Sequence, residues 1–195
     1  MNKKIIIVLS VLMASMFLLP VGLAESEPTT QFTFMDTITW DSTPEDVESV
    51  LGDGVQRTEQ TDESIGTIIL LQKDDTIFAD LNSKKMSLFF YNSKLYGIGC
   101  FYTEADVGDS DALIQGLTKI YGAPKMYDSN DLTINDFTSG AKTLCDWKIG
   151  DDTVITVLQL KDEKSPYLCI VSFENTPVVK QLEEALLKSE TQPEK

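Results

Sequence analysis

SLFFYNSKLYGIGCFY, at residues 87–102, is the stretch that says most about the architecture of this chain. Two runs rich in aromatic and aliphatic residues flank the pair Asn92-Ser93, which favours a tight turn. The pattern predicts a β-hairpin with one strand at Lys84–Tyr91 and the other at Lys94–Tyr102. The chain is therefore expected to contain an antiparallel sheet, around which the other elements are arranged.

Side chains alternate along a strand, so this hairpin has two faces, and neither of them is polar. The purely apolar face, which we expect to form the core under the helices, comprises Met86, Leu88, Phe90, Leu95 and Phe101. The opposite face is rich in tyrosine and comprises Ser87, Phe89, Tyr91, Tyr96, Ile98, Cys100 and Tyr102.

The tyrosine-rich face is the candidate binding surface. Tyrosine combines apolar area with a polar tip, and it is favoured where proteins meet one another. The predicted binding residues are Phe89, Tyr91, Tyr96 and Tyr102. The alternative is that the other half of the chain or the C-terminal helix covers this face, in which case these residues belong to the interior.

A short helix with both ends marked precedes the hairpin. Thr43 is a good N-cap, Pro44 suits the first helical position, and Asp46 stands where a capping box needs an acceptor. Gly52 ends the helix, because glycine tolerates the left-handed conformation found there. Two further strands are predicted between this helix and the hairpin, at Thr67–Gln72 and Thr76–Leu81.

The same order of a helix and then strands recurs after the hairpin. Apolar residues at three- and four-residue spacing predict a helix at Asp111–Tyr121, which Gly122 and Pro124 end. A last helix begins at Thr176-Pro177 and carries an apolar stripe that should dock on the body. Between these helices the sequence predicts a meander of three strands, at Lys142–Ile149, Thr153–Lys161 and Pro166–Glu174.

These elements predict an α+β fold of two tandem units, each a short helix followed by antiparallel strands, plus a C-terminal helix. An alternating parallel sheet is disfavoured, because its crossovers need about a dozen residues or more. The expected division is a signal peptide at 1–24, a linker and the start of ordered chain at 25–37, a first unit at 38–108, a second unit at 109–175, and the C-terminal helix and tail at 176–195.

The first two dozen residues have the pattern of a cleavable secretory signal peptide. Lys3 and Lys4 precede an apolar run of about 15 residues, which is short for a helix that must cross roughly 30 Å of hydrocarbon. Small residues before Glu25 suit a signal peptidase, so we expect cleavage after Ala24. The mature protein is predicted to be soluble and to lie outside the cell or in the cell envelope.

The chain is strongly acidic, with a formal net charge of −15 that becomes more negative once Lys3 and Lys4 leave with the signal. Such a surface repels phosphate backbones and anionic lipid, which argues against nucleic-acid and membrane-surface partners. The hydrophobic content of 42% is ordinary for a globular chain, so the charge does not indicate disorder.

The sequence contains no histidine, which excludes Ser-His-Asp and Cys-His catalysis, His-ligated zinc and imidazole acid–base chemistry. A glycosidase could work with two acids about 5–10 Å apart. With 31 acids in the chain, however, such a pair is expected by chance. We therefore predict no catalytic residues, no cofactor and no metal site.

The three cysteines, Cys100, Cys145 and Cys169, lie in strand-like apolar stretches. We expect them to be buried as small hydrophobic residues, and the alternative is that one pair forms a disulfide. In the predicted meander one strand separates Cys145 from Cys169, so the two lie about 9.5 Å apart and should not be bonded.

Two other patterns are assigned structural roles. Trp40 and Trp147 are predicted to anchor the core rather than to bind sugar. The acidic segment Asp128–Asp136 is predicted to be a solvated loop rather than a calcium site, because Leu132 and Thr133 stand where an EF-hand has an oxygen ligand and glycine.

Five stretches of the chain carry a resemblance to known proteins: FMDTITWDSTPEDVESVLG (34–52), SLFFYNSKLYGIGCFY (87–102), ALIQGLTKIYGAP (112–124), CDWKIGDDTVITVLQL (145–160) and YLCIVSF (167–173). In these stretches the chain resembles a group of uncharacterised secreted proteins of gut Firmicutes, in which a W-G-S-S-x-E-E-V helix start, an F-x-x-x-K-L hairpin and an L-x-x-K-Y-G-x-P helix end recur. Asp41 stands here where that group usually has glycine.

The tandem arrangement is also similar to β-lactamase inhibitor protein and to small outer-membrane assembly lipoproteins, which act by binding. This likeness concerns the fold and supplies no catalytic residues. We therefore predict a secreted, non-catalytic binding module whose partner is another protein or a cell-envelope component. The alternatives are a carboxylate-dependent hydrolase of glycans and a structural envelope protein.

Overall fold

The computed structural model describes residues 32–107, 110–127, 141–160 and 165–191. Its helices are α2 (Pro44–Leu51), α3 (Glu104–Val107), α4 (Ser110–Tyr121) and α5 (Thr176–Thr191). Its strands are β1 (Gln56–Asp62), β2 (Gly66–Phe78), β3 (Leu81–Tyr91), β4 (Lys94–Tyr102), β5 (Lys125–Met126), β6 (Ala141–Ile149), β7 (Thr153–Leu160) and β8 (Cys169–Asn175). The predicted signal peptide and the acidic segment Asp128–Asp136 lie outside the described residues.

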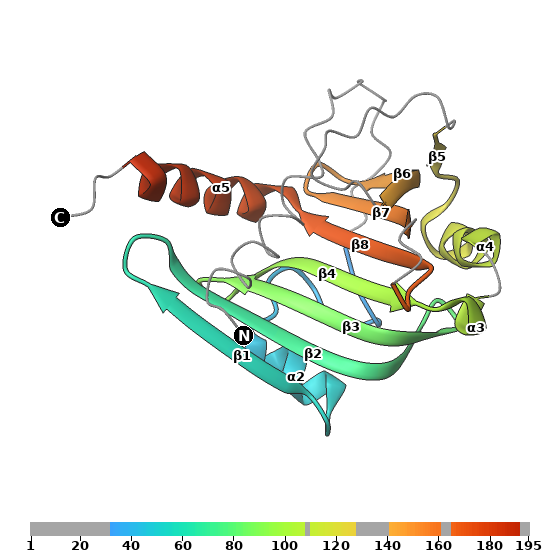
Figure 1. The fold of residues 1–195 in the computed structure, drawn as a ribbon, viewed down its shortest axis with the longest axis horizontal. Coiled ribbons are helices and arrows are strands. Elements are labelled where there is room, and N and C mark those ends of the chain that lie inside the picture. The colour runs from blue at the N-terminus through green and yellow to red at the C-terminus, as the bar shows by residue number, and fades with distance from the viewer. Residues whose placement is uncertain (1–31, 108–109, 128–140, 161–164, 192–195) are drawn as a thin grey trace.

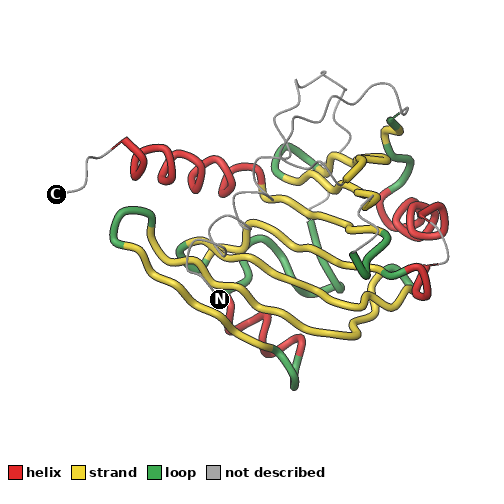
Figure 2. The backbone as a smooth tube through the Cα atoms, viewed as in Figure 1, coloured by secondary structure: helices red, strands yellow, loops and turns green. Residues whose placement is uncertain are grey.

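All these strands form one antiparallel sheet, in the order β1-β2-β3-β4-β8-β7-β6-β5 (Figure 1). The predicted α+β class is therefore confirmed. Strands β4 and β8 pair at the centre of the sheet. Strands β1–β4 therefore form one half of the sheet and β5–β8 form the other. The helices lie against the sheet and at its ends (Figure 2).

Helix α2 begins and ends as its sequence predicts. Thr43 Oγ1 accepts a hydrogen bond from the Asp46 amide at 3.2 Å, and the Asp46 carboxylate accepts one from the Thr43 amide at 2.9 Å. The pKa of Asp46 is lowered because the Thr43 amide and, at 2.8 Å, the Thr43 hydroxyl both donate to its carboxylate and favour the charged form. At the other end, the Lys73 ammonium donates to the Leu51 carbonyl, one of the helix carbonyls without an intrahelical partner.

The β3–β4 hairpin has the predicted turn but not the predicted faces. Asn92 and Ser93 have φ values of 48° and 63°, as a tight turn of this hand requires. The register then shifts opposite Phe89, where Tyr96 is an extra residue in β4. Past this bulge the alternation of β4 reverses. The assignment of Ile98, Cys100 and Tyr102 to the face of Tyr96 was therefore wrong, and so was that of Phe101 to the opposite face.

The region before the hairpin also differs from the prediction. The strands expected at Thr67–Gln72 and Thr76–Leu81 are one strand, β2, which continues through Asp75 at a φ of 51°. Strand β1, at Gln56–Asp62, was not predicted at all. In the second half, α4, β6 and β7 confirm the expected elements, and β8 begins at Cys169 rather than at Pro166.

One face of the sheet, which we call the helix face, carries the larger core. It bears Met86, Leu88 and Phe90, and it packs against α2, α4 and the segment around Phe34. Phe173 lies at its centre, with ring centroids between 5.2 and 6.2 Å from those of Phe32, Phe34, Phe78 and Tyr121. Side chains from both halves of the sheet therefore pack into one core on this face.

Both tryptophans contribute to this core, as expected. Trp147 is buried, and its indole N–H donates to the Gly122 carbonyl at 2.8 Å. Trp40 is half-buried, stacks on Phe32 with centroids 4.3 Å apart, and donates to the Thr153 hydroxyl at 2.6 Å. Each polar ring nitrogen is thus satisfied while the ring fills apolar space.

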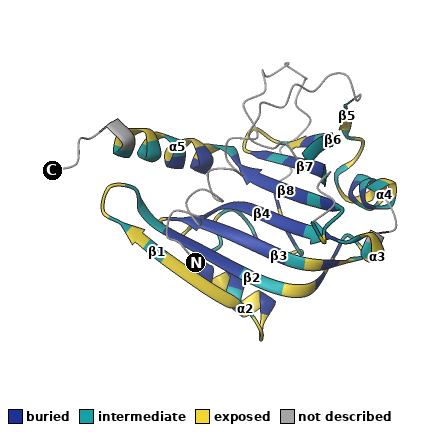
Figure 3. Ribbon diagram, in the orientation of Figure 1, coloured by how far each residue is buried: buried dark blue, intermediate teal, exposed yellow. Residues whose placement is uncertain are grey.

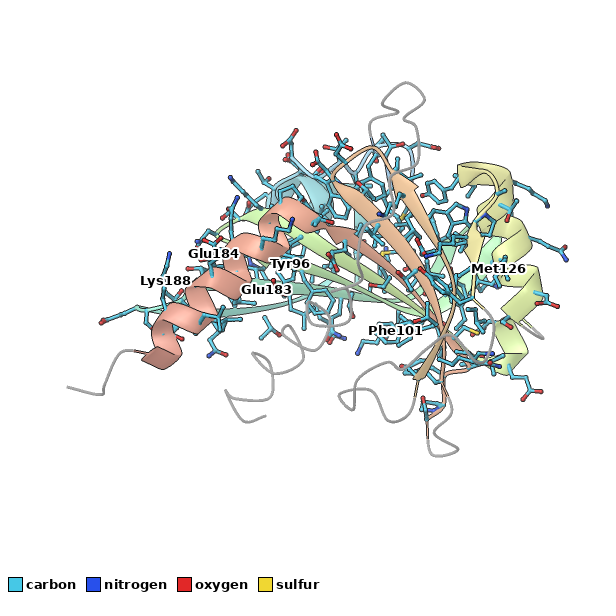
Figure 4. The ribbon with its side chains drawn as sticks, turned by 90° about the horizontal axis from the view of Figure 1, so that it is seen from above. Tyr96, Phe101, Met126, Glu183, Glu184 and Lys188 are labelled. Atoms are coloured by element: carbon cyan, nitrogen blue, oxygen red, sulfur yellow. The ribbon has the colours of Figure 1, made fainter. Side chains whose placement is uncertain are left out.

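The opposite face, which we call the α5 face, carries a smaller apolar cluster. Its sheet residues come from β2, β3 and β4, and α5 contributes three buried residues over them. Tyr96 lies beside α5 in Figure 4. The cluster comprises Ile68, Leu70, Phe89, Tyr91, Tyr96, Val178, Val179 and Leu182.

All three cysteines are buried, and none forms a disulfide in the described structure. Strand β7 lies between β6 and β8, so Val157 separates Cys145 from the β8 strand that carries Cys169. This confirms the predicted strand order. Burial raises the pKa of Cys145 to about 12 and that of Cys100 further, so these thiols stay protonated and unreactive at neutral pH.

Candidate functional site

The four predicted binding residues are interior. Phe89, Tyr91 and Tyr96 retain 3%, 8% and 1% of their surface and lie under α5 or beside it. The alternative stated above is therefore the one observed: the C-terminal helix, α5, covers Phe89, Tyr91 and Tyr96. Tyr102 is fully buried on the helix face, because the bulge at Tyr96 separates it from the other three.

A row of polar side chains crosses the α5 face away from the apolar cluster. Asp146 on β6 pairs with Thr156 on β7, which pairs with Ser172 on β8. Thr156 and Ser172 are buried, and Glu174 is buried two residues further along β8. Three oxygens of this group, Asp146 Oδ1, Thr156 Oγ1 and Glu174 Oε2, have no hydrogen-bond partner among the described residues.

Glu174 is an acid of the row whose pKa is raised. Burial raises its pKa to about 8, and the neighbouring carboxylate of Glu183 on α5 acts in the same direction. The Thr176 hydroxyl and the ammonium of Lys180 oppose this shift. Glu174 is therefore largely protonated at neutral pH, beside the first turn of the helix that covers the face.

The two edges of the sheet differ in how they are protected. Strand β5 has two residues, follows Pro124 directly and carries Lys125, so it offers little backbone for another strand. Strand β1 has seven residues, no proline, no lysine and no register shift against β2. Its first four residues, Gln56–Glu59, are all exposed (Figure 3).

The hydrogen bonds of β2 show which residues of β1 direct their backbone outward. The Thr67 carbonyl accepts from the Asn92 amide, and the Thr67 amide donates to the Asn92 side chain, so Thr67 faces β3. Its neighbour Ile68 therefore faces β1 and bonds Gln60. By alternation, Arg57, Glu59 and Thr61 direct their N–H and C=O groups away from the sheet. No described strand pairs with that side of β1.

Side-chain contacts hold β1 in place without covering its outer edge. The Asp62 carboxylate accepts from the Ser64 and Ile65 amides, and the Tyr91 hydroxyl donates to the Ile65 carbonyl at 2.8 Å. Gly66 completes the turn at a φ of 118°, where a Cβ would lie 2.6 Å from Asn92 Oδ1. The β1–β2 hairpin is thus tied to the β3–β4 turn.

Two opposite charges project from β1 on the side of α2. The Arg57 guanidinium lies 3.0 Å from Glu59 of the same strand, 2.9 Å from Glu45 and 3.5 Å from Glu48 on α2. These carboxylates raise the pKa of Arg57, and Arg57 lowers that of Glu45. The ion pairs are exposed to solvent, so we expect them to contribute little to stability.

The described residues contain no cluster of three His, Cys, Asp or Glu side chains that could hold a metal ion. In the same part of the chain, no helix combines the length and hydropathy that crossing a membrane requires. No family model, no curated protein and no solved structure matches this chain. The candidate site therefore has to be judged from its own geometry.

Sequence reasoning missed β1 because that strand has no apolar alternation to reveal it. Its sequence, QRTEQTD, is polar at every position. It therefore shows neither the helical nor the strand period in hydrophobicity. The available signal was the turn chemistry that follows, in which an aspartate and a glycine flank the loop at 63–65.

Proposed function

We propose that this chain is an exported, non-catalytic binding protein whose interaction surface is the outer edge of β1. The observation that carries the proposal is a largely exposed seven-residue strand in which Arg57, Glu59 and Thr61 direct backbone groups outward, where no described strand pairs with them. Its partner would be another protein or a component of the cell envelope that presents an extended segment. The signal-like pattern at residues 1–24 supports export.

Edge strands are where sheets recruit further chains, and natural proteins usually block them. The usual devices are short strands, charged side chains (lysine above all), proline and bulges. Strand β5 is short and carries lysine next to proline, whereas β1 has the charged residues Arg57 and Glu59 but is longer and has no lysine, proline or bulge. A partner strand added to β1 would gain main-chain hydrogen bonds, which supply affinity in this recognition mode, and its side chains would supply specificity.

We also propose that the fold consists of two tandem units, each a short helix followed by antiparallel strands. The first unit would be α2 followed by β1–β4, and the second α4 followed by β5–β8. The mirrored strand order supports this reading, because each unit would contribute four consecutive strands and the last strand of each would meet at the centre. In that arrangement β1 and β5 are equivalent edges, of which only β1 is long enough to bind a strand.

The test uses random peptides displayed on phage and selected against the mature chain. Glu59→Pro removes the central outward N–H of β1, at a position where proline is tolerated because that N–H does not bond β2. Glu59→Ala is the matched control, since it removes the side chain and keeps the N–H. We expect selected peptides to bind the mature chain and Glu59→Ala but not Glu59→Pro.

Thermal unfolding of both variants establishes that they are folded. Peptides that bind Glu59→Pro as well as they bind the mature chain would place the interaction surface elsewhere. Peptides that lose binding to Glu59→Ala as well would show that the Glu59 side chain, rather than strand addition, carries the recognition.

A further inference from the structure

We propose that the strand that pairs with β1 is β1 of a second copy of this chain, related by a two-fold axis through Thr58. The inference rests on the proposed function of this edge and names its partner. It joins two eight-stranded sheets into one continuous antiparallel sheet. Gln56–Glu59 are exposed, so no described residue has to move before the edges meet.

The outward backbone groups restrict the possible registers. In an antiparallel pair, residues that exchange hydrogen bonds must both face the partner, so odd-numbered residues of β1 pair with odd-numbered residues of the second copy. A two-fold axis must then pass through a residue. An axis through Arg57 or Glu59 sets that charge opposite its own copy, which is destabilising.

The axis through Thr58 is the one that matches the charges. It sets Arg57 opposite Glu59 of the second copy, and Glu59 opposite Arg57 of the second copy, so two opposite-charge pairs form. Thr58 meets Thr58, another favourable cross-strand pair. An axis through Gln60 would instead set Glu59 opposite Thr61 and Arg57 opposite Glu63, which lies beyond the end of β1.

The contacts within one chain already gather the charges that this register needs. Arg57 and Glu59 are two residues apart on the same side of β1, and their guanidinium and carboxylate are 3.0 Å apart. In the dimer each guanidinium would lie between its own Glu59 and Glu59 of the second copy. The pattern is therefore self-complementary, which distinguishes a second copy from an unrelated strand.

The overall charge and the size of the contact limit the affinity. The net charge of −15 opposes association at long range, but that repulsion is screened beyond about 8 Å at physiological ionic strength. Two strands of this length bury less surface than a standard stable interface. We therefore expect a weak dimer, with a dissociation constant of roughly micromolar or above.

The test uses sedimentation equilibrium at about 0.15 M salt to measure molecular weight. The samples are the mature chain, the two single variants Arg57→Glu and Glu59→Arg, their double variant, and a mixture of the two single variants. We expect Arg57→Glu and Glu59→Arg each to weaken the dimer roughly tenfold to a hundredfold, because each sets like charges opposite one another. The double variant Arg57→Glu/Glu59→Arg restores the opposite-charge pairs and should dimerise again. An equimolar mixture of the two single variants should form a heterodimer.

The matched control is Glu63→Arg, which makes the same charge change in the exposed turn beyond β1 and should leave the dimer unchanged. Recovery of association in the mixture cannot arise from misfolding of either variant. A dimer that persists in both single variants, or that fails to return in the double variant and the mixture, would overturn the proposed register.

A mature chain that stays monomeric up to about millimolar concentration would overturn the second copy as the partner. That result would leave the binding edge itself standing if selected peptides still bind the mature chain and not Glu59→Pro. A mature chain that neither dimerises nor captures peptides would contradict the proposal that the β1 edge is an interaction surface.

Discussion

Strands β8 and β1 have the same length, seven residues, and opposite surroundings. Strand β8 pairs on both sides, with β4 and β7, and is buried along nearly all of its length. Among the described strands β1 pairs with β2 alone, and it is exposed on both faces. The fold therefore draws its stability from the centre of the sheet, while the backbone at the β1 edge is left available for other interactions.

The largest effect is expected at the centre of the sheet. Phe173→Ala removes the ring that contacts Phe32, Phe34, Phe78 and Tyr121, and it should cost about 3–5 kcal/mol of unfolding free energy. Urea unfolding followed by tryptophan fluorescence measures this loss. A loss as small as that caused by Thr58→Ala on β1 would remove the contrast between the two strands.

A somewhat smaller loss is expected where α5 covers the sheet. Tyr96→Ser empties a site that is 1% exposed and packs beside Phe89, with ring centroids 6.0 Å apart. We expect a cost of about 2–4 kcal/mol in the same unfolding measurement, since the variant leaves a cavity under α5. Unchanged stability would mean that α5 is not docked there in solution, and that the tyrosine-rich face is accessible after all.

The next effect depends on pH and arises at Glu174 of β8. Its pKa is raised from 4.5 to about 8, so the folded chain keeps a proton that the unfolded chain loses. The stability contributed by this proton is fully present below pH 4.5 and is lost as the pH rises to about 8. Relative to Glu174→Gln, the mature chain should lose about 2–4 kcal/mol over that range.

Unfolding curves at a series of pH values, measured in parallel for the mature chain and Glu174→Gln, test this expectation. The difference between the two proteins isolates Glu174 from other acids, such as Asp46, whose lowered pKa gives the opposite slope. A difference that stays constant with pH would show that Glu174 is ionised in the folded protein.

The smallest effect on stability is expected at the edge. Arg57→Ala removes the exposed ion pairs with Glu45, Glu48 and Glu59, and it should change the unfolding free energy of the monomer by no more than about 1 kcal/mol. Dilute samples in the unfolding assay avoid any contribution from association. A loss comparable to that of Phe173→Ala would mean that β1 is part of the stabilising core.

The same contrast explains what the sequence predicts and what it does not. Local chemistry specifies the Thr43 cap, the Asn92-Ser93 turn and the meander of β6–β8, because each depends on neighbouring residues. The bulge at Tyr96 depends on packing against β3 and α5, so alternation alone misplaces Tyr102. Burial of the tyrosine-rich face follows from where a distant helix docks.

The candidate site was beyond the same reasoning for a related reason. Strand β1 is recognisable only by its pairing with β2, since none of its side chains is required for the core. Its proposed role depends on backbone groups, which every residue possesses and which leave no signature in composition. A polar, exposed segment therefore becomes informative only when its neighbours in the sheet are known.

Amide hydrogen exchange of β1, followed residue by residue by NMR, tests the central claim most directly. In a dilute sample we predict slow exchange at Thr58 and Gln60, which bond β2, and fast exchange at Arg57, Glu59 and Thr61, which face outward. Raising the concentration should slow Arg57 and Glu59, which exchange hydrogen bonds in the proposed dimer, and adding a selected peptide should slow the outward set alone. Slow exchange of Arg57, Glu59 and Thr61 in the dilute monomer would show that the edge is already paired, and would contradict its role as an interaction surface.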